Sequence, residues 1–149
     1  MNRMFQRFGR TIVPAAALAV MMGTGYWATA AEKGEQVKLT LSGDQEVPPV
    51  KTSASGSGTI TVGADKSVSG SVVTKGIEGT AAHIHEGAPE KNGPVIIPLT
   101  KGSDNATWSV PAGAKLTDAQ YDAFKAGNLY VNVHSAANKG GEIRAQLKP

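Results

Sequence analysis

Short runs in which apolar and polar residues alternate follow one another along most of the chain after residue 36. In Val37–Leu41 and Leu129–Ser135 every second residue is apolar, and this period of two places one set of side chains on a core-facing surface. Glycine, proline, asparagine and aspartate separate the runs at close spacing, which is typical of an antiparallel sandwich or barrel. We expect strands at residues 37–41, 59–62, 67–74, 80–85, 95–99, 106–110, 129–135 and 142–147.

One segment has the pattern of an amphipathic helix. Thr117 has the side chain of an N-cap residue, Asp118 follows it in the first turn, and Gly127 stands where a helix commonly ends. Tyr121 and Phe124 form a narrow apolar stripe between these ends. We therefore expect one short helix in an otherwise all-β domain.

Two segments carry residues that disfavour the middle of a sheet. Residues 53–58 are rich in glycine and serine, which predicts a flexible connection. Pro98 stands near the end of the strand expected at 95–99, and proline has no N–H group to donate to a neighbouring strand. That strand is therefore expected at an edge of the sheet.

The first thirty residues have the features of a secretory signal peptide. Arg3, Arg7 and Arg10 precede a mostly apolar stretch at residues 12–23, and Ala28–Ala30 has the small-residue pattern of a cleavage site. We expect cleavage after Ala30, a single domain at residues 31–149, and a periplasmic or secreted protein with no membrane span left after cleavage. An uncleaved segment would instead act as an N-terminal anchor.

Charge and composition exclude several classes of function. The formal net charge of +3 comes from the three arginines of the signal segment, because removing them from 15 basic residues leaves 12 against 12 acidic ones. A neutral domain without a basic run disfavours nucleic-acid binding. The chain has no cysteine, and its four methionines all lie in the first thirty residues. Thiolate and thioether metal sites are thus excluded from the domain.

The three histidines point to a metal site. His83 and His85 stand two apart in one expected strand, so their side chains share a face about 6.6 Å apart. His134, near the end of another expected strand, can supply the third ligand if the two strands are neighbours. Imidazole nitrogens suit Cu(II) or Zn(II), and the affinity order favours Cu(II). The alternative is that all three histidines are ordinary polar or hydrogen-bonded structural residues.

Four further polar residues are candidates for supporting the metal site. Tyr130 and Asn132 share the face of His134, while Glu46 and Glu142 could orient a ligand or provide a fourth one. For Glu46 and Arg144, a structural ion pair or a turn clamp is the favoured alternative. For Tyr130 and Asn132, the alternative is hydrogen bonding between strands.

Several motifs, taken together and in order, resemble those of the CHRD domain. This family is named after chordin and also occurs as single-domain exported bacterial proteins. The resemblance implies an immunoglobulin-like Greek-key β-sandwich, but it implies little about activity. It marks Glu46, Tyr130, Asn132, Glu142, Arg144 and all three histidines as motif positions. The motifs are Leu41–Pro49, Ala82–His85, Asn92–Pro94, Leu116–Gln120, Gly127–His134 and Gly141–Arg144.

The sequence therefore favours an exported metal-binding protein over an enzyme. We expect it to bind copper, with zinc as the alternative, through His83, His85 and His134, for storage, buffering or delivery. The second hypothesis is a module that binds an envelope or extracellular protein without metal. The histidine pattern also resembles the copper ligands of Cu/Zn superoxide dismutase, but a two-metal dismutase is disfavoured because no further histidine remains for its zinc site.

Overall fold

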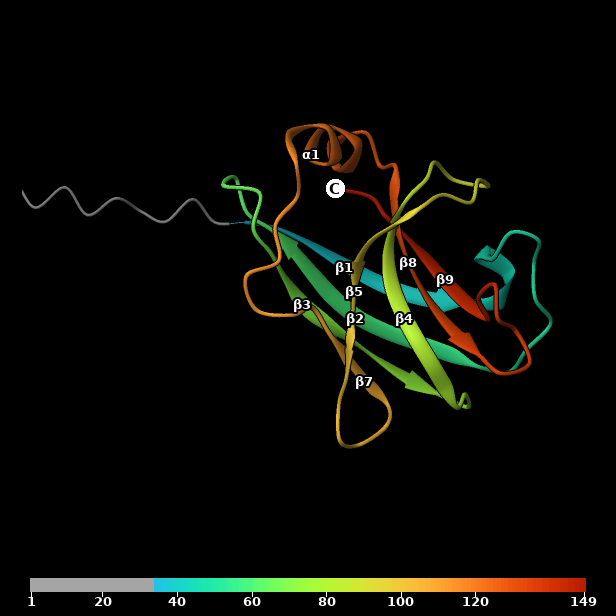
Figure 1. The fold of residues 1–149 in the computed structure, drawn as a ribbon. Coiled ribbons are helices and arrows are strands. Elements are labelled where there is room, and N and C mark those ends of the chain that lie inside the picture. The colour runs from blue at the N-terminus through green and yellow to red at the C-terminus, as the bar shows by residue number, and fades with distance from the viewer. Residues whose placement is uncertain (1–33) are drawn as a thin grey trace, which may run out of the picture.

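The computed structural model describes residues 34–149, which form one antiparallel sheet of nine strands and one α-helix. The predicted signal peptide at residues 1–30 lies outside the described residues. Across the sheet the strands follow the order β5-β4-β8-β9-β1-β2-β3-β7-β6 (Figure 1). Their bounds are β1 Glu35–Ser42, β2 Ser55–Val62, β3 Val68–Lys75, β4 Gly79–Glu86, β5 Val95–Pro98, β6 Thr100–Lys101, β7 Thr107–Ser109, β8 Leu129–Ser135 and β9 Ile143–Leu147. The α-helix, α1, spans Asp118–Lys125, and a 3₁₀ turn, η1, spans Gly43–Gln45.

The sheet curls until its two edge strands almost meet. β5 and β6 lie at opposite ends of the strand order, yet only Leu99 separates them along the chain. The backbone N–H of Leu99 donates to the carbonyl of Ala82 on β4 at 2.9 Å. An all-β antiparallel fold with one short helix is confirmed. The immunoglobulin-like Greek-key sandwich is not confirmed, because the strands form one nearly closed, barrel-like sheet.

The glycine- and serine-rich segment belongs to the sheet. Residues 55–58 form the first half of β2, where Gly58 pairs with Leu39 on one side and Val72 on the other. A side-chain carbon at Gly58 would overlap the backbone of Ser71 and Val72. Glycine thus allows β3 to approach closely. The prediction of a flexible connection is wrong for these residues, whereas the predicted edge position of Pro98 is confirmed.

Helix α1 begins and ends where the sequence predicts. The Thr117 hydroxyl accepts the backbone N–H of Gln120 at 3.2 Å, and the Gln120 side chain accepts the backbone N–H of Thr117 at 2.9 Å. This reciprocal capping satisfies two donors that the first helical turn leaves free. Gly127 follows the helix with a φ of +75°, a conformation that glycine adopts without steric cost. The helix lies at the end of the barrel near the C-terminus (Figure 1). Its Phe124 belongs to the core cluster.

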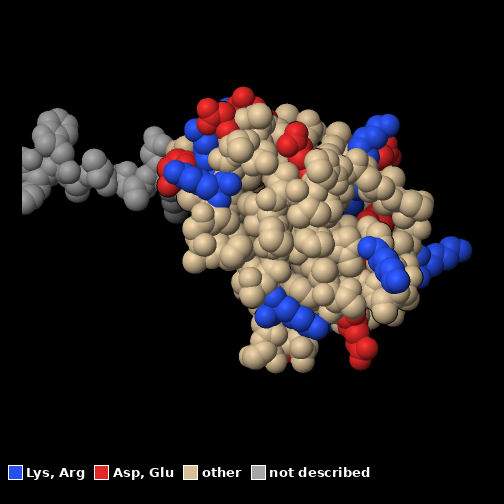
Figure 2. Space-filling view, in the orientation of Figure 1, with Lys and Arg blue, Asp and Glu red and all other residues tan. Residues whose placement is uncertain are grey.

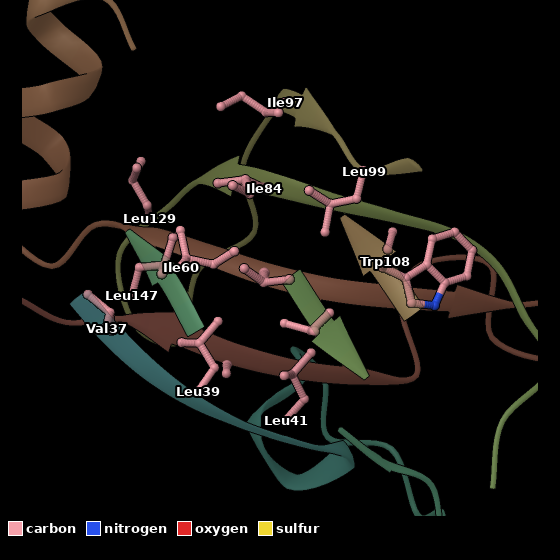
Figure 3. Close-up of a cluster of buried hydrophobic side chains, with 14 of the residues drawn as sticks. Val37, Leu39, Leu41, Ile60, Ile84, Ile97, Leu99, Trp108, Leu129 and Leu147 are labelled. Carbon is pink, nitrogen blue, oxygen red and sulfur yellow. The ribbon is translucent and has the colours of Figure 1, made fainter. Parts of the chain in front are cut away.

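The core fills the inside of the curled sheet. Every second residue of β1 is buried, as alternation predicts, and β8 and β9 contribute their own inward-facing residues. Figure 3 shows Leu39 and Leu41 of β1 and Ile60 of β2 in one cluster with Ile84 of β4 and Trp108 of β7. Because side chains from all around the sheet converge, the barrel interior is a packed core.

Basic and acidic side chains are interspersed on the face shown in Figure 2. Within residues 34–149, no helix has the length and apolar character needed to cross a lipid bilayer.

Candidate metal centre

Two neighbouring strands bring the three histidines together. β4 pairs antiparallel with β8, with His83 opposite Asn132 and Ala81 opposite His134. His83 Nδ1 lies 2.9 Å from His134 Nε2. One ring nitrogen from each of His83, His85 and His134 lies within 4.8 Å of the others, so the group could hold a metal ion. The sequence left open whether the two histidine strands are neighbours, and the pairing of β4 with β8 shows that they are.

Backbone carbonyls orient two of the rings. His85 Nδ1 lies 2.8 Å from the Gly93 carbonyl oxygen, and His134 Nδ1 lies 2.8 Å from that of Lys139. A carbonyl oxygen only accepts, so Nδ1 is the protonated nitrogen of both rings and Nε2 of each neutral ring keeps its lone pair. A metal-ligating histidine is typically held in this way.

His85 Nε2 has no hydrogen-bond partner although its atom is buried. Only 7% of the His85 surface is exposed, so solvent does not replace the missing partner. A buried acceptor without a donor is unfavourable, and native proteins rarely leave one. The donor set of neutral imidazole nitrogens, one of them unpaired, fits a bound transition-metal ion.

The environment of the histidines favours their neutral, ligating form. Burial lowers the pKa of His83, and the neighbouring rings of His134 and His85 lower it further. Burial also lowers the pKa of His85, although the hydrogen bond to the Gly93 carbonyl opposes this. Since a metal ion competes with protons for imidazole nitrogens, a lowered pKa keeps both ligands available in mildly acidic solution.

Acid should therefore destabilise the metal-free fold through these two histidines. Below the ordinary histidine pKa of 6.5 the unfolded chain takes up protons that folded His83 and His85 resist, so their contribution to stability is lost as pH falls. As the pH falls from 7.5 to 5, we expect the free energy of unfolding of a His83→Gln/His85→Gln variant to rise relative to that of the parent. Urea unfolding of both proteins at each pH measures this difference. A difference that stays constant with pH would contradict the prediction.

The family assignment agrees with the motifs of the sequence. The family model described as the CHRD domain matches residues 37–147, from β1 to β9. The chain belongs to the CHRD family. No curated protein and no solved structure matches it. The matched range contains all three histidines of the candidate centre.

In this CHRD domain the residues of β8 that face away from the core, next to the histidines, are also buried. Alternation predicts that Tyr130 and Asn132 point away from the core, and both are nevertheless only 2% exposed. The loop at residues 87–94 covers Tyr130: the Gly93 backbone N–H donates to the Tyr130 hydroxyl at 3.1 Å. Asn132 instead lies against the turn at Gly140, whose carbonyl accepts from its Nδ2 at 3.4 Å. The loop is in turn tied to the segment after η1, where Asn92 Nδ2 donates to the Val47 carbonyl at 2.7 Å.

Glu46 is buried next to this covered layer without an ion-pair partner. It is 4% exposed, and its Oε1 atom has no hydrogen-bond partner. Burial raises the pKa of Glu46 to about 7, although the Arg144 charge and a hydrogen bond from Asn132 oppose the rise. Of the two alternatives for Glu46 and Arg144, the ion pair is wrong, whereas Arg144 does clamp a turn through Ala88 and Asn92. The ion pairs of the described residues are Lys66–Asp118 and Lys125–Asp122.

The other candidate carboxylate takes part in a different contact. Glu142 accepts a hydrogen bond from Thr52 Oγ1 at 2.7 Å and does not belong to the histidine group. Hydrogen bonding from Ser135, together with that from Thr52, lowers the pKa of Glu142, so the carboxylate is ionised at neutral pH. The contact with Thr52 links the residue just before β9 to the segment just before β2.

Sequence reasoning misses three glycine and lysine positions around the site. Gly93 and Lys139 act through their backbone carbonyls, and the type of side chain at a position does not predict such a contact. Gly141 has a φ of +126°, and a side-chain carbon there would overlap Glu46 and Asn132. The breakers in Asn92–Pro94 and Asn138–Gly141 were the available signal, since they mark the loops that return to the histidines.

Proposed function

We propose that this CHRD protein binds one transition-metal ion through His83, His85 and His134, with Cu(II) preferred to Zn(II). The unpaired, buried Nε2 of His85 within a group of three ring nitrogens is the observation that carries the proposal. Three neutral imidazoles form a nitrogen-rich site, and the affinity order places Cu(II) above Zn(II) at such sites.

The spacing of the nitrogens is close to that of a three-histidine centre. Metal–nitrogen bonds of about 2.1 Å separate two ligand nitrogens by at most about 4.2 Å. The ligand atoms here lie within 4.8 Å of one another, so small side-chain rotations suffice to bring them to a common ion. Three protein ligands leave a coordination position open for water or for a ligand from a partner.

The role that follows is storage, buffering or delivery of the metal. Because the predicted signal peptide directs the domain out of the cytoplasm, the role belongs to the periplasm or the cell exterior. His83 and His134 are only partly buried, which leaves the centre accessible from solvent. An exposed open position suits uptake and release of an ion.

Metal titration of the protein purified from expression of the full chain tests the proposal. We expect one equivalent of Cu(II) to bind, Zn(II) to bind more weakly, and a His83→Ala/His85→Ala variant to lose affinity by more than about 100-fold. Calorimetry and metal analysis after dialysis provide the measurements.

The control variant is Glu86→Gln, which removes a carboxylate next to His85 in sequence and keeps every histidine. It should bind copper as the parent does, because Glu86 does not belong to the group of ligand atoms. If the parent does not bind either metal, the proposal fails and a role in binding another protein takes its place. Superoxide turnover by the copper-loaded protein would support a redox enzyme instead.

A further inference from the structure

On the face opposite the core, a stack of three side chains connects the candidate metal centre to β9. The His85 and Tyr130 rings lie parallel, with centroids 4.7 Å apart and an interplanar angle of 6°. The Arg144 guanidinium carbon lies 3.5 Å from the centroid of the Tyr130 ring. Because β8 lies between β4 and β9, Tyr130 lies between His85 and Arg144.

Arg144 also holds the loop that orients His85. Its guanidinium donates to the Ala88 carbonyl at 3.2 Å and to Asn92 Oδ1 at 3.4 Å. These two contacts hold the loop at Ala88 and at Asn92, the residue just before Gly93. The Gly93 carbonyl then accepts from His85 Nδ1. Arg144 thus reaches His85 by two routes, one through the Tyr130 ring and one through the loop backbone.

The burial of Arg144 is costly and therefore calls for a reason. The side chain is 1% exposed, and its hydrogen-bond acceptors are all neutral oxygens, including Gln146 Oε1 at 3.1 Å. A buried charge without an ionised hydrogen-bonding partner costs free energy. A planar guanidinium can stack on an aromatic ring and donate sideways at the same time, which a lysine cannot do.

We propose that Arg144 is a positioning residue of the metal centre. Through Tyr130 and the Ala88–Gly93 loop it holds the His85 ring in one orientation, with Nδ1 on the Gly93 carbonyl and Nε2 free as the ligand atom. The inference rests on the proposed function, because it assigns Arg144 to the same centre. A merely structural Arg144 would stabilise the fold without affecting how a bound metal is held.

Two variants change different contacts around His85. Arg144→Lys keeps the charge and loses the planar guanidinium that stacks on Tyr130. Tyr130→Phe keeps the ring and loses the hydroxyl that contacts Gly93. Lys148→Gln serves as the control, because Lys148 is exposed and lines the same surface cavity as Arg144. Circular dichroism first establishes which variants fold. If Arg144→Lys does not fold, Arg144→Gln carries the test, because it removes the stacked guanidinium and the buried charge together.

The first readout needs no metal. ¹⁵N NMR of the imidazole nitrogens should show His85 of the parent and of Lys148→Gln protonated at Nδ1 only, and a mixture of tautomers in Arg144→Lys. The second readout is Cu(II) binding. Loss of a residue that orients a ligand typically lowers metal affinity 10- to 100-fold, so we expect Arg144→Lys to weaken Cu(II) binding by about that factor and to change its EPR spectrum. Tyr130→Phe should give a smaller change of the same kind.

The outcomes separate the inference from the proposed function. Folded variants with the parent's His85 tautomer, Cu(II) affinity and EPR spectrum would overturn the role of Arg144 while leaving the copper site intact. A parent that binds no copper would overturn the metal centre, and with it the functional role of Arg144. In that case an altered His85 tautomer in the variants would show only that the contacts hold the ring.

Discussion

Replacing Glu46 by glutamine is expected to stabilise the fold by about 2–3 kcal/mol at pH 8 and to leave its stability nearly unchanged at pH 4. The pKa of Glu46 is about 7 in the folded protein against an ordinary value of 4.5. The folded state therefore holds a proton that the unfolded state releases between pH 4.5 and about 7. Stability from this group is present below pH 4.5 and is lost as pH rises through 7, where the buried carboxylate must ionise.

Glutamine removes that loss because it is neutral at every pH. Its amide group also supplies a permanent donor where Glu46 Oε1 and Asn132 Oδ1 are both buried acceptors without a partner. Urea unfolding of parent and variant at pH 4, 6 and 8 measures the effect as a difference between the two proteins. A variant less stable than the parent at pH 8 would show that the Glu46 carboxylate is ionised and compensated in the fold.

Glu142→Gln is the matched control and should behave in the opposite way. The pKa of Glu142 is lowered, chiefly by a hydrogen bond from Ser135, so its ionised form stabilises the folded state above pH 4.5. The substitution should therefore reduce stability at pH 8 and have little effect below pH 4. Equal pH profiles for the two glutamine variants would rule out the burial argument for Glu46.

Copper is expected to stabilise the fold by about 2.7 kcal/mol when the free ion is present at 100 times its dissociation constant. Only the folded chain brings His83, His85 and His134 within reach of one ion, so binding shifts the folding equilibrium toward the native state. For a domain of this size the shift in Tm is about 10 °C. Thermal unfolding followed by circular dichroism, with and without Cu(II), measures it.

The same titration with His83→Ala/His85→Ala separates binding at the centre from adventitious binding. The variant should show no copper-dependent rise in Tm, because His134 alone cannot chelate the ion. The Glu86→Gln control should shift as the parent does. An equal rise in the parent and the double alanine variant would place the copper elsewhere on the chain.

Local patterns predicted the elements and the histidine group because both depend on spacing. The period of two located the strands and put His83 and His85 on one face, as Ala82 and Ile84 on the core face confirm. The capping residues fixed helix α1 at Thr117. At residues 55–58 the glycine- and serine-rich composition wrongly predicted a flexible connection. These residues belong to β2, where glycine leaves room for the close approach of β3.

The sequence by itself therefore determined an all-β chain with one capped helix, the CHRD motifs, and a histidine pair on one strand face with a third histidine on another strand; the pairing of β4 with β8 brought the three together. Only the tertiary structure decided that the sheet closes nearly into a barrel, that Glu46 is buried without Arg144 as an ion-pair partner, and that Arg144 stacks on Tyr130. The physical reason is distance along the chain. Burial and hydrogen bonding at these positions come from the loop at 87–94 and the segment at 43–50, which lie far in sequence from β8 and β9 and meet them only when the sheet curls.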